Sequence, residues 1–302
     1  MSQKSLRIGM VSPYGWDIPG GVQIHIRELA EHFIAQGHYV SVIAPVSDED
    51  SIDDPWLVSA GRPVPIPFNG SVARVLFGPH CGRHGFDSGL PKGNLMSYIC
   101  TSQGFPHYRF WHVGAAEGAM VGTFHASAPK LRAIATVGPL VEPMIEKLSA
   151  RIAVSEMAQA TLNNLYGTEA VVIPNGIDCS RFAGVRAVSA SENLVVPQIG
   201  FLGRFEESRK GLPLLFEALP KVIKSIPDVQ LLVAGPGDPT KLLSKLDSNI
   251  AKHITFLGRL TEDEKVDFLS GLSLYVAPNT GGESFGIILA ESDGVRNSRP
   301  CK

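Results

Sequence analysis

The feature that most constrains this chain is a repeated alternation of short apolar runs with amphipathic stretches. The first run, at 6–11, leads into a loop that contains Gly20 and Gly21. Apolar residues at helical spacing follow over 22–33, before the next run at 39–44. Strand, glycine loop, helix and strand in this order are typical of a doubly wound parallel sheet. The sequence therefore predicts an α/β fold.

The alternation continues in two series. The first adds predicted strands at 119–124, 151–154 and 170–173, with a helix of about twenty residues after the first of these strands and another helix at 155–166. The second predicts strands at 198–202, 229–234, 254–257 and 274–277, separated by helices at 211–225, 239–247 and 261–271. The segment 183–193 is small, polar and aperiodic, as linkers are. We expect two Rossmann-like domains in tandem, at 1–182 and 194–302.

Composition excludes several classes of protein. The 302 residues are 44% hydrophobic and 19% charged, as in soluble globular proteins, and the net charge is 27 − 29 = −2. No global field favours nucleic acid, so we expect no nucleic-acid partner. No apolar run approaches the ~20 residues that cross a bilayer, and the N-terminus has no apolar signal core, so a cytoplasmic protein is expected. The four cysteines form no CxxC pair, which favours reduced thiols.

Two glycine-containing loops are candidates for binding phosphate. Gly21 lies between the first strand and its helix, where a bare backbone and free helix N–H groups favour an anion, although a plain tight turn fits equally well. In the second domain, Arg204 follows the first strand, and Arg209 and Lys210 precede the next helix. Three cations at the carboxyl end of a strand suit a diphosphate. A solvated loop is the alternative.

Two glutamates form a further candidate site. Glu283 and Glu291 lie eight residues apart after a glycine turn, a spacing that returns to nearly the same face of a helix. Carboxylates accept pairs of hydrogen bonds from vicinal hydroxyls, as sugars and ribose offer. The alternative is a pair of glutamates that faces solvent.

Taken together, these motifs make the chain resemble a retaining glycosyltransferase of the two-Rossmann-domain type (GT-B), family 4. Within this family it is most similar to the actinobacterial phosphatidyl-myo-inositol mannosyltransferases. The resemblance rests on IGMVSPYGWDIPGGVQIHIRELAEHF, VPIPFNGSVARVLFGP, VGTFHAS, RIAVSEMA, IPNGID, GFLGRFEESRKG and GGESFGIILAE. These motifs span most of 6–79 and 113–291.

The resemblance implies roles for individual residues. The implied catalytic residue is His125. Acceptor-binding residues would be Tyr14, Gln23, Phe68, Asn69 and Arg74. Donor-binding residues would be Gly21, Arg204, Arg209, Lys210, Leu260, Thr261, Glu262, Lys265, Glu283, Ser284, Phe285, Gly286, Ile287 and Glu291.

The resemblance also implies a reaction. Mannose would pass from GDP-mannose to a phosphatidylinositol-type lipid with retention, the acceptor attacking on the face that the diphosphate leaves. No tightly bound cofactor is expected. A divalent cation is compatible, although no metal motif occurs, and Asp48 to Asp50 are read as a solvated loop. The lipid acceptor implies peripheral contact at the inner face of the plasma membrane.

Two segments depart from the family pattern. The stretch 80–112 lacks apolar periodicity, and a zinc insert using His80, Cys81, His84 and Cys100 matches no standard spacing. Permitted codons for 95–112, read two bases later, encode YVLHMHEPGFPSLSFLA, which restores the expected strand. Codons for 292–297 with one base dropped encode AMACG. We therefore hypothesise two shifts of reading frame, which the DNA around codons 80–113 and 291–302 tests.

The frame hypothesis predicts a damaged enzyme. The first sheet would lose a central strand together with a membrane-facing basic cluster, and the second domain would be incomplete after Glu291. Little or no transferase activity is then expected of this chain. Two alternatives stay open: a non-catalytic remnant that binds a nucleotide sugar, and a family 4 transferase with another donor and acceptor.

Overall fold

The computed structural model describes residues 5–18, 20–49, 53–68, 71–75, 95–98, 119–125, 138–182, 196–281, 283 and 285–296. The chain divides into two compact units. The N-terminal unit is Met1–Gly176 with Glu283–Phe285, and the C-terminal unit is Ile177–Gly282 with Gly286–Lys302. This division at Gly176 falls earlier than the boundary that the sequence suggests at 182. The predicted linker at 183–193 lies outside the described residues.

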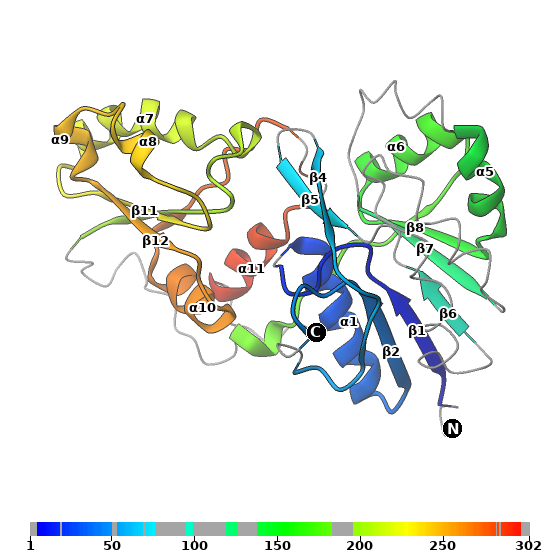
Figure 1. The fold of residues 1–302 in the computed structure, drawn as a ribbon. Helices are drawn as coiled ribbons and strands as arrows, with labels where there is room; N and C mark the ends of the chain where they lie inside the picture. The colour runs from blue at the N-terminus through cyan, green and yellow to red at the C-terminus, as the bar shows by residue number, and fades with distance from the viewer. Residues whose placement is uncertain are drawn as a thin grey trace. The chain divides into compact units, whose positions relative to one another are not determined.

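The N-terminal unit is built on a parallel sheet of seven strands, in the order β3-β2-β1-β6-β7-β8-β9 (Figure 1). Its strands are β1 Arg7–Val11, β2 Tyr39–Ala44, β3 Leu57–Ser59, β6 Leu95–Tyr98, β7 Met120–Phe124, β8 Ala150–Ala153 and β9 Val171–Val172. The predicted α/β fold with a parallel sheet is confirmed. A separate antiparallel pair consists of β4 Val64–Phe68 and β5 Ser71–Val75.

The central strand β6 contradicts one expectation. Leu95 and Met96 pair with Ile8 and Gly9 of β1, and the other edge of β6 pairs with β7. The prediction that the segment 80–112 deprives the sheet of its central strand is therefore wrong. The ladder of a parallel sheet is made by backbone N–H and C=O groups, so the four residues of β6 suffice to join β1 and β7. The four residues of the alternative zinc insert lie outside the described residues.

The helices described in the N-terminal unit are α1 Gly21–Ala35, α5 Gly138–Lys147 and α6 Glu156–Tyr166. The apolar stripe of α1 packs on β1 and β2, and Ile26 and Ala30 of this stripe are fully buried. Gly37 ends the helix in the left-handed conformation with φ 83°, as its position in the sequence suggests. Helix α5 falls within the stretch where a helix of about twenty residues is predicted, and residues 126–137 before it lie outside the described residues.

The C-terminal unit has a parallel sheet of four strands in the order β12-β11-β10-β13. Its strands are β10 Gln198–Leu202, β11 Gln230–Ala234, β12 Ile254–Gly258 and β13 Leu274–Tyr275. Its helices are α7 Leu212–Ser225, α8 Thr240–Leu243, α9 Ser248–Ala251, α10 Glu262–Gly271 and α11 Ile287–Arg296, with 3-10 turns η3 Cys179–Phe182 and η4 Ser208–Lys210. The single helix predicted at 239–247 is wrong, because Asp247 caps a separate helix through its side chain.

Both faces of this sheet are covered by apolar packing. Leu231 and Val233 of β11 join a buried cluster with α7, whereas their neighbours Leu232 and Ala234 join a second cluster with α10 and α11. Successive side chains of a strand point to opposite faces, so the two clusters lie on the two sides of the sheet. The unit is therefore doubly wound.

Helix α11 continues beyond Glu291 and adds to the core. Val295 is fully buried in a cluster with Phe182, Val266 and Leu269. It lies four residues after Glu291, so both side chains occupy one face of the helix. The chain after Glu291 therefore still contributes Val295 to the core of the C-terminal unit.

Two further observations bear on the sequence predictions. Cys179 is disulfide-bonded, so the expectation of reduced thiols is wrong at this position. Sequence spacing does not reveal which thiols a fold brings within bonding reach. In the part of the chain that the structure describes, no helix is long and apolar enough to cross a bilayer.

Candidate functional site

The turn from β10 into α7 gathers the three predicted cations of the C-terminal unit. Arg204 lies two residues after the end of β10, and Arg209 and Lys210 form the end of η4. Gly211 then starts α7 with φ 74°, and a Cβ atom there would clash with the carbonyl oxygen of Pro278. The N–H group of Thr280 donates to the Arg209 carbonyl at 2.9 Å. Two loops at the carboxyl ends of the strands thus meet where the cations lie.

Glu207 orients two of these cations. Its Oε2 lies 2.6 Å from Nη2 of Arg209, and its Oε1 lies 3.5 Å from Nη1 of Arg204. Glu207 is 6% exposed, whereas both arginine side chains are partly exposed. The carboxylate therefore holds two guanidinium groups from the protein side and leaves them accessible to a ligand. The sequence prediction missed Glu207 because a carboxylate among cations is also typical of a solvated loop.

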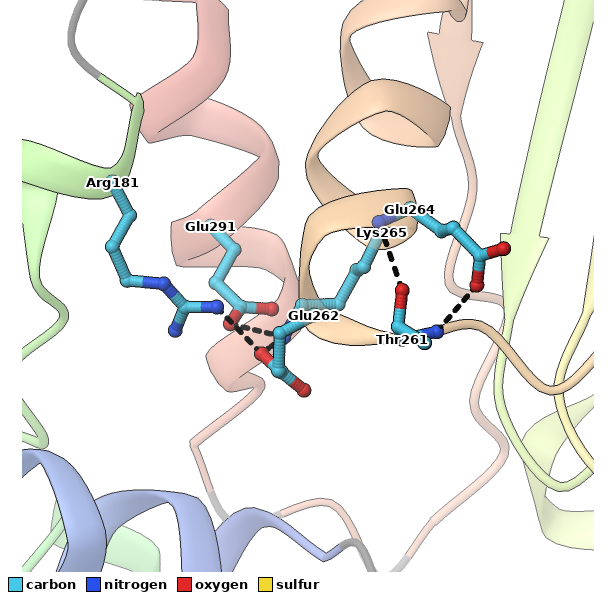
Figure 2. Close-up of polar contacts among 6 residues, drawn as sticks. All are labelled: Arg181, Thr261, Glu262, Glu264, Lys265 and Glu291. Atoms are coloured by element: carbon cyan, nitrogen blue, oxygen red, sulfur yellow. Dashed lines mark hydrogen bonds and ion pairs between the residues drawn. The ribbon is translucent and has the colours of Figure 1, made fainter.

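A second group of charged residues joins α10, α11 and η3 (Figure 2). Nζ of Lys265 lies 2.7 Å from Oε1 of Glu291 and 2.7 Å from Oε2 of Glu262. Nη2 of Arg181 lies 2.8 Å from the same Oε2. Glu291 is 1% exposed and Lys265 is 6% exposed, so this pair is buried. Oε2 of Glu291 has no hydrogen-bond partner among the described residues.

The first turn of α10 is fixed by a capping box. The Thr261 side chain accepts from the Glu264 N–H at 3.2 Å, and the Thr261 N–H donates to Oε2 of Glu264 at 2.7 Å. These bonds satisfy helix N–H groups that would otherwise lack partners. Leu260, the residue before the cap, packs against the core of the unit. Glu262 and Lys265, one turn apart, therefore have fixed backbone positions.

The cations keep Glu262 ionised. Burial acts to raise the pKa of this carboxyl group, but hydrogen bonds from Arg181 and Lys265, together with their charges, outweigh burial and lower it. An ionised carboxylate only accepts hydrogen bonds. Glu262 thus offers an acceptor to the donor groups of a ligand.

The loop before α11 shows that the predicted placement of Glu283 and Glu291 on one helix face is wrong. Glu283 precedes Ile287, the first residue of α11, so the two glutamates do not share a helix. The glycine-rich turn delays the helix, and Gly286 has φ 78°. Glu283 and Phe285 group with the N-terminal unit, where Phe285 packs against a core cluster. The predicted donor residue Ser284 lies outside the described residues.

In the N-terminal unit, the predicted acceptor residues cluster around the loop after β1. Nε2 of Gln23 donates to the carbonyl oxygens of Gly15 and Ile18 at 3.1 Å and 3.0 Å. The Gly15 N–H donates to the Arg74 carbonyl at 2.9 Å, and Tyr14 forms a β-bridge with the neighbouring strand β5. Arg74 itself is exposed. Hence the structure brings Tyr14, Gln23 and Arg74 together.

The remaining predicted residues of this unit are placed less fully. Gly21 is the first residue of α1, whose N-cap makes no side-chain hydrogen bond. Phe68 is the last residue of β4. Asn69 lies outside the described residues.

His125 lies at the end of β7 against a second histidine. The ring centroids of His125 and His25 are 5.0 Å apart with an angle of 63° between the planes, and Nε2 of each ring is buried with no hydrogen-bond partner in the described part of the chain. Burial lowers the pKa of His25 to about 4. Burial and the charge of His25 lower the pKa of His125 to about 3. Both rings are neutral at physiological pH, and His25 was missed by the sequence prediction.

The described residues offer no cluster of three or more histidine, cysteine, aspartate or glutamate side chains that could hold a metal ion. The side chains gathered at the two charged groups are instead cations and carboxylates paired with each other. Such an arrangement can bind phosphates at one end and hydroxyl or N–H donors at the other.

Two family models match the chain. One, described as Glycosyltransferase Family 4, matches residues 19–181, and the other, described as Glycosyl transferases group 1, matches residues 196–293. A solved sucrose-phosphate synthase from Thermosynechococcus elongatus has a TM-score of 0.66 and 20% identity, covering 96% of this chain and 79% of that chain. This structural likeness shows the GT-B fold.

Relatives of known name are closer in sequence. A phosphatidyl-myo-inositol mannosyltransferase from Mycobacterium tuberculosis (strain ATCC 25618 / H37Rv) is 42% identical over 291 residues, covering 95% of this chain and 75% of the relative. One of the same name from Propionibacterium freudenreichii is 36% identical over 293 residues, covering 95% and 74%. The chain therefore belongs to glycosyltransferase family 4, in one family with the phosphatidyl-myo-inositol mannosyltransferases, and is a hexosyltransferase.

Proposed function

We propose that the chain transfers mannose from GDP-mannose to a phosphatidylinositol-type lipid, with retention at the sugar. The observation that carries the proposal is the pair of charged groups in the C-terminal unit. Arg204, Arg209 and Lys210 offer cations to a diphosphate, and the buried Glu291 offers ribose hydroxyls a carboxylate oxygen that no described residue hydrogen-bonds.

The chemistry of such a donor supports the assignment of these groups. A nucleoside diphosphate carries negative charge in its middle and hydrogen-bond donors on its ribose and base. In this proposal the diphosphate meets the cations at the start of α7, and the guanosine meets Leu260, Thr261, Glu262 and Lys265. The mannose hydroxyls are assigned to Glu283 and the backbone from Ser284 to Ile287, and Gly21 is assigned to the donor phosphate.

The acceptor is assigned to the N-terminal unit. Arg74 is exposed and charged, which suits the phosphate of an inositol lipid. Tyr14, Gln23, Phe68 and Asn69 are assigned to the inositol ring. A lipid acceptor requires the protein to meet a membrane surface, and we place this contact at the inner face of the plasma membrane.

His125 supplies the proposed catalytic group. Its ring is neutral and its Nε2 has no partner among the residues described, so it can form a hydrogen bond with a sugar or acceptor hydroxyl without a change in charge. The departing diphosphate is stabilised by Arg204, Arg209 and Lys210, placed before the reaction begins. Retention follows if the acceptor attacks from the face that the diphosphate leaves.

Calorimetry with GDP-mannose beside a transfer assay tests this proposal. We expect the chain to bind GDP-mannose, and Arg204→Gln with Lys210→Gln to weaken binding by about tenfold or more, since each removes a charge-assisted contact to phosphate. Lys221→Gln, on the exposed side of α7, is the matched control for charge. Absence of binding would overturn the donor assignment, and tighter binding of UDP-sugars would favour another family 4 donor.

A second candidate function, binding of a nucleotide sugar without turnover, is favoured by the same two charged groups. The transfer assay separates it from the first. Binding of GDP-mannose without mannose transfer to phosphatidylinositol vesicles supports the non-catalytic function.

A further inference from the structure

Arg181 approaches the nucleotide site from a part of the chain that the sequence prediction did not connect with it. It lies in η3, 81 residues before Glu262, and Nη2 donates to Oε2 of that glutamate at 2.8 Å (Figure 2). Nζ of Lys265 lies 2.7 Å from the same oxygen. Two cations therefore share one oxygen of Glu262. Both cations lie at Oε2, so within the described part of the chain Oε1 of this carboxylate remains for a ligand.

Packing holds Arg181 in place. The next residue, Phe182, is 3% exposed and belongs to the same buried cluster as Val266 and Leu269 of α10 and Val295 of α11. A 3-10 turn anchored by a buried phenylalanine against both helices has a fixed position relative to them. The helices in turn carry Glu262, Lys265 and Glu291. Arg181 thus belongs to the same rigid packing unit as the residues that it contacts.

A contribution to folding stability does not explain the ion pair between Arg181 and Glu262. The Glu262 side chain is 50% exposed and the Arg181 side chain 28% exposed, and ion pairs at such exposure contribute little to folding. Their effect is on geometry. A carboxylate with one oxygen held by two donors loses freedom about its terminal torsion, so the direction of its second oxygen is set before a ligand arrives.

We propose that Arg181 is a positioning residue that gives the nucleotide site its preference for guanine, by holding Glu262 so that its free oxygen meets the base. This inference rests on the proposed donor site. Guanine presents an N1–H group and an amino group side by side, both donors, whereas adenine presents an acceptor at N1. A carboxylate only accepts hydrogen bonds, so it binds the guanine edge and is repelled by N1 of adenine.

The test is the ratio of the dissociation constants of ADP and GDP, measured by calorimetry on the full chain. For Arg181→Gln we expect the dissociation constant for GDP to rise about tenfold while that for ADP stays within about twofold, since only the guanine contact depends on Glu262. Arg181→Lys restores part of the preference, because it keeps the charge but lacks the planar guanidinium fork. A purely structural role would weaken both nucleotides equally.

A double-mutant cycle with Glu262→Gln sharpens the result. If Arg181 acts through Glu262, then adding Arg181→Gln to Glu262→Gln changes the ratio little further. Lys221→Gln controls for loss of one positive charge. A wild-type chain that prefers GDP, with the preference unchanged in Arg181→Gln, overturns this inference alone. A wild-type chain that binds neither nucleotide, or both equally, overturns the proposed donor site and the inference with it.

Discussion

Lys265 is the residue on which the charge arrangement of the C-terminal unit depends. It is buried between Glu262 and Glu291, at 2.7 Å from each. Removing charged groups from water costs more than their attraction returns unless every group is well paired, so a buried ion pair is weak support for stability. The pair is better explained by the orientation that it gives to Glu291.

Lys265→Met tests this at the residue scale. The substitution leaves Glu291 buried without its cation, so we expect the free energy of unfolding of the C-terminal unit to fall by about 3–5 kcal/mol. Hydrogen exchange of amides in α10 and α11 measures this change. The double variant Lys265→Met with Glu291→Leu should recover much of the stability but no nucleotide binding. A loss below about 1 kcal/mol in the single variant would contradict a buried, charged Glu291.

Single residues show where sequence reasoning succeeds and where it stops. The cations Arg204, Arg209 and Lys210 were predicted because they lie close together along the chain. Arg181 and His25 were not, because their partners lie 81 and 100 residues away and only the fold brings them together. Local pattern carries no signal for such pairs.

At the scale of elements, the turn from η4 into α7 depends on Gly211. Gly211 and Gly258 have nearly the same positive φ, 74° and 72°, but only at Gly211 would a Cβ atom meet backbone, the Pro278 carbonyl. Comparing alanine substitutions at Gly211 and Gly258 therefore separates the free-energy cost of the left-handed backbone from the cost of a Cβ atom that contacts neighbouring backbone.

Gly211→Ala should therefore destabilise the C-terminal unit more than Gly258→Ala. A left-handed alanine costs about 1–2 kcal/mol at either site, and overpacking adds about 1–3 kcal/mol at Gly211. Because Arg209 and Lys210 directly precede Gly211, GDP binding should weaken in this variant and stay near wild type in Gly258→Ala. Urea unfolding followed by circular dichroism and calorimetry with GDP measure both effects. An equal loss of unfolding free energy in the two variants would show that a Cβ atom at Gly211 does not clash with Pro278.

Elements were predicted well where periodicity and punctuation agree. The strands Tyr39–Ala44 and Gln198–Leu202 have the predicted bounds, since each is an apolar run closed by turn residues. The helix predicted at 239–247 is reduced to α8, which ends at Leu243, and α9 begins after the Asp247 cap; the helix around Glu283 begins only at Ile287. In both places a helix cap or a glycine turn sets where the helix begins, and the apolar pattern alone does not show this.

At the scale of the whole molecule, the two buried histidines make the N-terminal unit sensitive to acid. The unfolded chain binds protons at both rings below about pH 6.5, whereas the folded unit excludes them until the pH nears about 4 and about 3. The free energy of unfolding of this unit should therefore fall as the pH drops from about 7 towards 4, by up to about 1.4 kcal/mol per pH unit for each histidine.

Fluorescence isolates this transition, since the three tryptophans, at 16, 56 and 111, all belong to the N-terminal unit. His25→Phe removes one of the two proton-binding rings but keeps an apolar ring of similar shape. Its stability should depend less steeply on pH between about 4 and 6 than that of the wild type. Identical pH dependence in the two proteins would show that His25 is protonated in the folded state.

The two groups of charged residues in the C-terminal unit differ in net charge. Arg204, Arg209 and Lys210 exceed Glu207 by two positive charges, 3 − 1 = +2, whereas Arg181 and Lys265 balance Glu262 and Glu291, 2 − 2 = 0. A net charge acts over the screening length of the solution, about 8–10 Å, while a balanced group acts only on contact. The first group therefore governs how fast an anionic ligand arrives, and the second how long it stays. Added salt should therefore slow the association of the diphosphate with the first group and leave the dissociation rate of the nucleoside from the second group nearly unchanged.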